Sequence, residues 1–340
     1  MIVSLKADAN PAEVLRALVS RGLWVTQVER SASGEPRHYV IASYSAATSV
    51  ADLSGIEGVS SVTTAKPDHP RVAAQGPSVD VAGVSVGGGK PAFMVGPCSV
   101  ESEAHVREIA ERLAPLGVAF LRGGAYKPRT SPYAFQGHGE PALGWLKRAA
   151  EATGMKVVTE ALSEADVPAV AELADLVQIG SRNMQNYALL KAVGRTGRPV
   201  LLKRGMSATM DEWLHSGEYL LAGGARGVIF CERGIRSFDD ATRNLLDLGA
   251  VALLAHVHKL PVIVDPSHGA GRRDLIVPLG RAALAAGAAG LMIETHGDPA
   301  TALSDGPQAI PLAEISAVIR ELRGAVPRPA LNVNVNGGAS

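Results

Sequence analysis

Long hydrophobic runs, a set of cysteines and an excess of charge of either sign are all missing from this sequence of 340 residues. The longest apolar stretches are interrupted by glycines or by His258 and Lys259, which leaves none long enough for a membrane-spanning helix. Two cysteines, Cys98 and Cys231, do not describe a disulfide framework and favour a reducing compartment. The 33 basic and 33 acidic residues balance, which argues against nucleic acid as the main partner. We therefore expect a cytoplasmic protein that binds neither a membrane nor nucleic acid.

Residues 1–70 are typical of a small α/β domain. Strands and helices alternate there in the order β-α-β-β-α-β, which indicates a ferredoxin-like fold. The expected elements are, in chain order, 2–5, 11–21, 23–28, 38–43, 46–53 and 58–63. Because this stretch holds no nucleophile, metal cluster or phosphate loop, we interpret it as a ligand-sensing or assembly domain, with a packing appendage as the alternative. Residues 71–90, rich in Pro, Gly and Ser, are predicted to be a linker with a β-hairpin near 79–86.

From residue 91 to residue 325 the sequence repeats a strand followed by a helix. Eight strands are expected, at residues 92–95, 118–121, 156–159, 176–179, 200–202, 227–230, 262–264 and 290–293. Capping pairs, such as Thr209 with Glu212 and Ser237 with Asp240, mark expected helix starts. Eight such repeats predict a (β/α)8 TIM barrel. A doubly wound open sheet is the alternative, but no G-x-G-x-x-G fingerprint follows the first strand. Residues 326–340 are expected to be a flexible tail.

Cations gather at the carboxyl ends of the expected strands, where barrel enzymes carry out their chemistry. The loop after the second strand adds two hydroxyls, from Thr130 and Ser131, and is stiffened by Pro128. Alone, each cation is better explained as a surface ion-pair partner. Together they predict a site for a small, multiply charged anion such as a phosphorylated substrate. The residues are Arg122, Lys127, Arg129, Arg182, Lys203, Arg204 and Arg233.

A second group combines a thiol, an imidazole and two carboxylates. Cys98, His268, Glu294 and Asp305 follow the first, seventh and eighth strands. The first and eighth strands are neighbours in a closed barrel, so these side chains are expected to meet. The mixed donor set suits a divalent transition-metal ion rather than magnesium or calcium. The alternatives are that Cys98 is a small buried hydrophobe and that His268 is a hydrogen-bonded turn residue.

Seven motifs carry a resemblance to a known family. They are GPCSVES at 96–102, KPRTS at 127–131, IGSRNMQN at 179–186, LLKRGM at 201–206, CERGIR at 231–236, VDPSHGAGRRD at 264–274 and ALSDGPQ at 302–308. With these motifs in this order, the chain resembles 3-deoxy-D-arabino-heptulosonate 7-phosphate (DAHP) synthase, and most closely the compact-barrel branch of that family. The N-terminal stretch resembles, more weakly, the ferredoxin-like regulatory domain of some members.

The resemblance implies a transferase that condenses phosphoenolpyruvate with erythrose 4-phosphate, the first step of the shikimate pathway. It implies one ion of Mn, Fe, Co or Zn, held by Cys98, His268, Glu294 and Asp305. It assigns phosphoenolpyruvate to Arg122, Lys127, Arg182, Lys203 and Arg233, and the aldose phosphate to Arg129, Thr130 and Ser131. Of the site residues, Cys98 and His268 act through the ion, Lys127 is the candidate proton donor, and Glu160, after the third strand, is the candidate for positioning water. Feedback inhibition by tyrosine or phenylalanine, and a homodimer or homotetramer, are also implied.

Three other functions remain open. The sister family, 3-deoxy-D-manno-octulosonate 8-phosphate synthase, shares the GPC, CERG and ALSDGP patterns but takes arabinose 5-phosphate. The KPRTS run and the run from Asp265 to Gly269 argue against it. Lys203, at the end of the fifth strand, could form a Schiff base in a metal-free aldolase. A non-catalytic barrel that senses phosphosugars is the alternative outside enzymes.

Overall fold

The computed structural model describes residues 1–30, 36–42, 45–64, 68–129 and 131–324. It divides into two compact units, one containing Met1–Asp68 and the other spanning His69–Arg328. The expected flexible tail, 326–340, lies outside the described residues, as does Thr130. No helix in the described part of the chain is long and apolar enough to cross a membrane.

The first unit has the ferredoxin-like fold expected from its sequence. Its elements are β1 (Ile2–Leu5), α1 (Pro11–Val19), β2 (Val25–Arg30), β3 (Pro36–Ile41), α2 (Val50–Ser54) and β4 (Val59–Thr63). The sheet order is β2-β3-β1-β4, and every pair is antiparallel. Val3 and Leu5 alternate with exposed neighbours, so one face of the sheet packs on Val14 and Leu18 of α1 and Leu53 of α2. Asn10 and Ser49 cap the two helices.

The second unit is the expected barrel. Its eight parallel strands are β7 (Ala92–Gly96), β8 (Phe120–Arg122), β9 (Lys156–Glu160), β10 (Leu176–Ile179), β11 (Val200–Lys203), β12 (Val228–Glu232), β13 (Val262–Val264) and β14 (Gly290–His296). Pairing of β14 with both β13 and β7 closes the sheet. Most strand residues are buried because helices cover the outside and side chains fill the inside.

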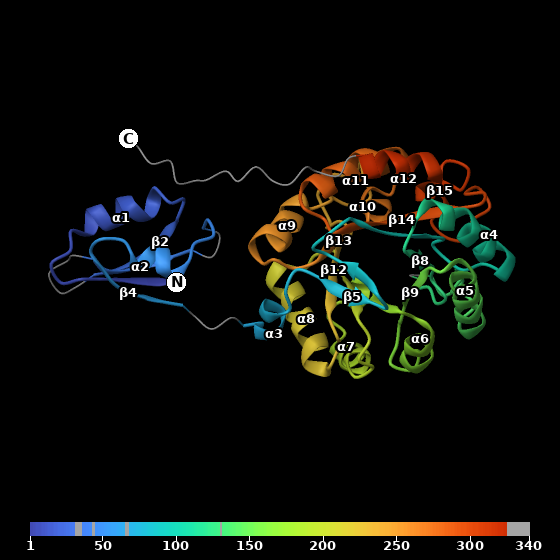
Figure 1. Cartoon of the computed structure of the whole chain (residues 1–340), viewed down its shortest axis with the longest axis horizontal. Helices are drawn as coiled ribbons and strands as arrows, with labels where there is room; N and C mark the ends of the chain where they lie inside the picture. The colour runs from blue at the N-terminus through green and yellow to red at the C-terminus, as the bar shows by residue number, and fades with distance from the viewer. Residues whose placement is uncertain (31–35, 43–44, 65–67, 130, 325–340) are drawn as a thin grey trace. The chain divides into compact units, whose positions relative to one another are not determined.

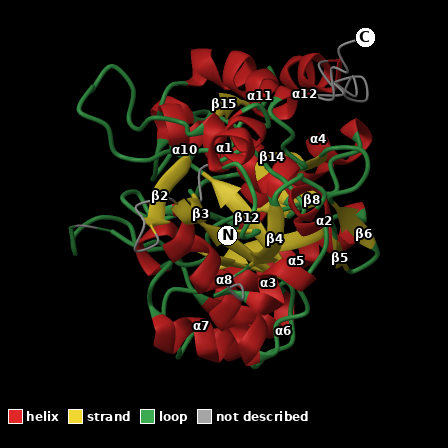
Figure 2. Cartoon of the chain, turned by 90° about the vertical axis from the view of Figure 1, so that its left-hand side faces the viewer, coloured by secondary structure: helices red, strands yellow, loops and turns green. Residues whose placement is uncertain are grey.

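Helices surround the strands, as Figure 1 and Figure 2 show. They are α4 (Glu103–Leu113), α5 (Glu140–Thr153), α6 (Val167–Leu173), α7 (Tyr187–Gly194), α8 (Met210–Gly223), α9 (Leu248–Ala252), α11 (Ile276–Ala285) and α12 (Ile315–Gly324). The capping box of Thr209 and Glu212 starts α8, as expected. The prediction of a helix start at Ser237 is wrong, because residues 233–247 form an irregular loop after β12. The short helix α10 (Pro266–Ala270) follows β13, and the short strand β15 (Ile310–Pro311) pairs with β14.

Residues 69–91 close the amino-terminal end of the barrel. The helix α3 (Pro70–Ala74) packs on α8, where the Glu218 carboxylate accepts the backbone N–H groups of Arg71 and Val72. The hairpin expected near 79–86 is present as β5 (Val79–Val81) and β6 (Val84–Val86), and its valines join the core inside the barrel. Val79 touches Gly227, just before β12, where an added Cβ would lie 2.8 Å from the valine side chain. The carboxyl ends of the strands are therefore left to form the site.

Candidate active site and metal centre

A cavity of about 370 Å³ lies at the carboxyl ends of the strands. Its lining is mostly cationic and hydroxylic, which suits a phosphorylated ligand. The lining includes these residues expected from the sequence: Lys127, Arg129, Ser131, Glu160, Arg182, Lys203, Arg233, His268 and Asp305. Arg122, Cys98 and Glu294 are buried and do not line the cavity. Arg204 is also buried, but it pairs with Glu232 and Asp247 instead of facing the cavity.

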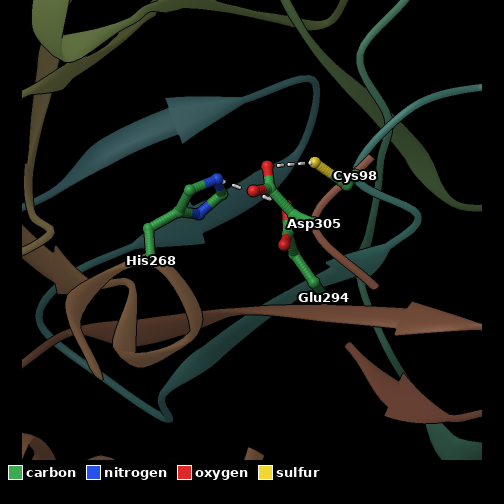
Figure 3. Close-up of side chains that lie close together, drawn as sticks. All are labelled: Cys98, His268, Glu294 and Asp305. Atoms are coloured by element: carbon green, nitrogen blue, oxygen red, sulfur yellow. Dashed lines mark hydrogen bonds and ion pairs between the residues drawn. The ribbon is translucent and has the colours of Figure 1, made fainter. Parts of the chain in front are cut away.

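The four proposed metal ligands point toward one another, as Figure 3 shows, and His268 and Asp305 also line the cavity. Their ligand atoms all lie within 4.8 Å of one another. The Cys98 thiol donates to Oδ2 of Asp305 over 3.1 Å, and Nε2 of His268 lies 3.4 Å from Oε1 of Glu294. A thiol, an imidazole and two carboxylates at this spacing fit a borderline divalent ion. The donor set and its compactness therefore support a metal ion here.

Burial controls the chemistry of the thiol. Burial, and then the nearby Glu294, raise the pKa of Cys98 to about 12, although Lys127 opposes this. The ammonium of Lys127 donates to Sγ over 2.9 Å and to the carbonyl oxygen of Cys98 over 3.2 Å. A metal ion must therefore displace a proton from Cys98 in order to bind the thiolate.

Asp265 orients the histidine, a role that the sequence did not single out. Its fully buried carboxylate accepts the backbone N–H of His268 over 2.9 Å and faces Nδ1 over 2.7 Å. Burial opposes ionisation, yet the neighbouring His268 and Lys203 hold the pKa of Asp265 well below its usual range. An ionised carboxylate places the proton on Nδ1 and leaves the Nε2 lone pair toward Glu294, as in carboxylate–histidine–metal triads.

Two of the cations belong to this buried network. Arg122 donates from Nη1 to Oε1 of Glu294 and to the carbonyl oxygen of Pro97, each over 2.8 Å. Lys203 forms a buried ion pair with Asp265 over 2.5 Å. Breaking either pair would leave a buried charge without a counterion, so both pairs hold the ligands in place.

Glu160 lines the cavity at the carboxyl end of β9. Its carboxylate accepts from the amide of Gln178 over 2.8 Å. It also fills the space above Gly180, where an added Cβ would lie 2.0 Å from Oε1. A side chain at position 180 would therefore displace Glu160, which explains the glycine in the IGSRN motif.

Besides Asp265, the structure adds two residues that sequence reasoning missed. Arg243 lines the cavity and donates to Oδ1 of Asp305 over 3.2 Å and to the side chain of Gln308 over 2.9 Å. Gln308 in turn donates to Oε2 of Glu294 over 2.6 Å. Gln308 stands in the ALSDGPQ motif and could have been found there. Arg243 had no signal, because it sits in the irregular loop after β12 where a helix was expected.

The chain matches one family model and is similar to two kinds of phosphosugar aldolase. Residues 63–325 match the DAHP synthetase I family. The chain is 50% identical over 258 residues, which is 76% of each protein, to the phospho-2-dehydro-3-deoxyheptonate aldolase of Thermotoga maritima. It is 35% identical over 250 residues, 68% of this chain and 88% of the other, to a 2-dehydro-3-deoxyphosphooctonate aldolase of Acidithiobacillus ferrooxidans.

Two solved structures of proteins from Thermotoga maritima are similar to this chain. The crystal structure of its phospho-2-dehydro-3-deoxyheptonate aldolase matches with a TM-score of 0.74 at 41% identity, covering 95% of this chain and 96% of that one. A truncated form of its 3-deoxy-D-arabino-heptulosonate 7-phosphate synthase matches with a TM-score of 0.68 at 47% identity, covering 73% of this chain and 90% of that one. With a family match over 63–325, the chain belongs to the DAHP synthetase I family.

Proposed function

We propose that this enzyme condenses phosphoenolpyruvate with erythrose 4-phosphate and water to give DAHP and phosphate. The observation that carries the proposal is the placement of a cationic cavity directly beside the Cys98–His268–Glu294–Asp305 cluster. Phosphoenolpyruvate carries a carboxylate and a phosphate, and each needs a cation in a site that excludes water. The 50% identity to a heptonate aldolase, against 35% for an octonate aldolase, supports the four-carbon sugar.

Each residue has a task in this proposal. Arg182, Lys203 and Arg233 hold the anionic groups of phosphoenolpyruvate, with Arg122 beneath them, while Arg129 and Ser131 face the aldose phosphate. A bound Mn, Fe, Co or Zn ion, held by the four ligands, supplies Lewis-acid polarisation of the aldehyde. The methylene carbon of phosphoenolpyruvate bonds to the aldehyde carbon, water adds at C2, and phosphate leaves with cleavage of its C–O bond.

Lys127 donates the proton to the new hydroxyl, and Glu160 positions the attacking water. Burial alone would lower the pKa of Lys127, but the neighbouring Cys98 and Glu294 raise it, so the side chain is an ammonium. Lying 2.9 Å from the sulfur, it can pass a proton to the aldehyde oxygen as that oxygen becomes a hydroxyl. Glu160, which also lines the cavity, orients the water that attacks C2.

The substrate is tested with a panel of aldose phosphates and phosphoenolpyruvate. We expect erythrose 4-phosphate to exceed arabinose 5-phosphate by about a hundredfold in kcat/KM, because one misplaced phosphate or hydroxyl leaves buried polar groups unpaired. Phosphate release is followed with and without a chelator. Equal turnover of the two sugars would contradict the proposal, and a preference for arabinose 5-phosphate would favour the octonate enzyme.

Arg129→Ala is expected to separate the two substrates. It should raise KM for the aldose phosphate by about tenfold or more and leave KM for phosphoenolpyruvate within about twofold, because one charge-assisted contact is lost at only one subsite. Arg226→Ala is the matched control, since Arg226 is exposed and precedes β12 at the other end of the barrel. An equal rise in both KM values would place Arg129 in the phosphoenolpyruvate subsite instead.

We also propose that the ferredoxin-like unit is regulatory. Its core shares no residue with the barrel's cores, and no metal-ligand cluster was found among its described residues. Removing residues 1–68 should therefore leave the condensation rate within about threefold and abolish inhibition by tyrosine or phenylalanine, as expected of two coupled sites. The measurement is inhibition by each amino acid in the full and shortened chains. Inhibition that survives the deletion, or no inhibition of the full chain, contradicts this role.

The family resemblance further supports a homodimer or homotetramer, which light scattering would measure. A cytoplasmic location is part of the same proposal, because Cys98 must stay reduced to bind a metal.

A further inference from the structure

The segment that follows β7 is joined to the loop that follows β14. Residues 98–101 and 303–305 run in opposite directions and are joined by two side-chain contacts and one backbone-to-side-chain contact. Each contact uses polar atoms, and each partner lies about two hundred positions away in the chain. The contacts are Cys98 Sγ to Asp305 Oδ2 at 3.1 Å, Ser99 Oγ to Ser304 Oγ at 2.6 Å, and the Leu303 N–H to Glu101 Oε1 at 2.8 Å.

His296 extends this connection to the other end of the same loop. Its Nδ1 accepts the backbone N–H of Asp298 over 3.1 Å, so the proton of the neutral ring is on Nε2. Nε2 is buried and forms no hydrogen bond with the described residues, but it lies 3.3 Å from Oε2 of Glu101. The imidazole thus binds the start of the loop at Asp298, the carboxylate binds its end at Leu303, and the two side chains face each other between them.

The surroundings of this pair favour a structural link over a catalytic one. His296 is 6% exposed, and neither His296 nor Glu101 lines the cationic cavity. The ring of His105, on α4, packs against His296 at a centroid distance of 4.2 Å. Burial lowers the pKa of His105, so this neighbour is neutral and adds no competing charge near neutral pH.

The loop needs such a link because Asp305 sits in an unfavourable backbone conformation. Its φ is +49°, in the left-handed region that non-glycine residues rarely adopt. The next residue, Gly306, packs so closely that an added Cβ would lie 2.2 Å from the carbonyl oxygen of Pro299. The carboxylate of Asp305 therefore depends on contacts outside its own turn for its place beside Cys98.

We propose that Glu101 and His296 are positioning residues that hold the 298–305 loop so that Asp305 is preset beside Cys98. This Glu101–His296 clamp thereby sets the affinity of the site for its divalent ion. The inference rests on the metal site of the proposed function, but not on the identity of the sugar substrate. Outer contacts that orient a metal ligand typically change metal affinity by about 10- to 100-fold.

A second metal site is the competing explanation, because ligand atoms of Glu101, His105 and His296 also lie within 4.8 Å of one another. Two contacts argue against it. The Nδ1 bond to Asp298 leaves Nε2 of His296 protonated, without a lone pair for a metal. One oxygen of Glu101 is already used by the Leu303 N–H.

The test is Glu101→Gln, which keeps the shape but turns an N–H₂ group toward either Nε2–H of His296 or the Leu303 N–H. The Kd for Mn²⁺ and Zn²⁺ is measured by competition with a chromophoric chelator. We expect Kd to rise about 10- to 100-fold, with one ion still bound per chain. Faster hydrogen exchange in residues 298–305 should accompany it. Glu103→Gln is the matched control, because Glu103 is exposed and forms a surface ion pair with Arg148.

A Kd for Glu101→Gln within about twofold of wild type would overturn the clamp. The clamp would also be overturned if the wild type bound a second ion and Glu101→Gln lost only that second ion. If Glu101→Gln does not fold, His296→Gln provides the same comparison, since its amide N–H₂ can face Glu101 while the Nδ1 acceptor of the Asp298 N–H is lost. In the double variant the two effects should not add, because the residues act as one unit. Additive effects would refute the link.

These measurements separate the clamp from the proposed function. A preference for another sugar would contradict the proposed substrate but would not contradict the clamp. Wild-type protein that binds no divalent ion would overturn the metal site and the clamp together. Normal turnover of erythrose 4-phosphate with an unchanged Kd in Glu101→Gln would overturn the clamp alone.

Discussion

Replacing Cys98 with alanine should abolish both metal binding and turnover. The change removes one of four converging ligands, and it removes the partner of both Lys127 and Asp305. A Lewis-acid ion supplies several kcal/mol of transition-state stabilisation, so kcat/KM should fall by on the order of a thousandfold or more. The measurements are elemental analysis of the purified variant and phosphate release after re-addition of Mn²⁺, Fe²⁺, Co²⁺ or Zn²⁺.

Cys231→Ala is the matched control for this prediction. Cys231 is also a fully buried thiol at the carboxyl end of a strand, β12, but it does not belong to the metal-ligand cluster. We expect this variant to keep its bound ion and its kcat/KM within about threefold, at some cost in stability from the lost packing.

The Schiff-base alternative predicts the opposite pattern. A chelator would then have no effect, Cys98→Ala would keep its activity, and borohydride with substrate would label Lys203. The ion pair of Lys203 with Asp265 argues against this outcome, because a Schiff-base lysine must offer a free lone pair. Full activity in a preparation shown to be metal-free would nevertheless overturn the metal mechanism.

Replacing Asp265 with asparagine should have the second largest effect. Asp265 accepts from both His268 and Lys203, and an amide cannot balance the buried lysine charge. Leaving a buried charge unpaired typically costs about 3–5 kcal/mol of stability, and losing the ligand's orienting partner weakens metal binding by about 10- to 100-fold. We therefore expect lower stability in urea, a raised Kd for the ion and a kcat/KM reduced by at least about a hundredfold.

Asp274→Asn is the control, because Asp274 lies in the same VDPSHGAGRRD motif but is exposed and pairs with Arg272. Adding Lys203→Met to Asp265→Asn should recover part of the stability, since the unpaired charge is removed, but none of the activity. Wild-type metal affinity in Asp265→Asn would show that His268 is oriented by something else.

Local sequence was sufficient for the architecture because barrel strands have a strong local signal. Strands buried on both faces are short, continuous apolar runs, such as Val200–Lys203 and Val262–Val264. Capping residues mark some helix starts, as at Thr209. The same reasoning failed after β12, where a capping pattern at Ser237 predicted a helix and the chain forms a loop. A cap adds about 1 kcal/mol, which tertiary contacts easily outweigh.

The sequence by itself determined the barrel, the ferredoxin-like unit and the residue types at each strand end. Closure of the barrel then makes a meeting of Cys98 with Glu294 predictable, because β7 and β14 must pair. Only the tertiary structure decided which groups hold these ligands: Asp265 against Lys203, Arg243 against Asp305, and Glu101 with His296 across the 298–305 loop. Such contacts join polar residues on irregular loops far apart in the chain. The side chains of a loop do not repeat with the period of two residues of a strand or of 3.6 residues of a helix. The loop sequence therefore does not indicate which distant residues its side chains will contact.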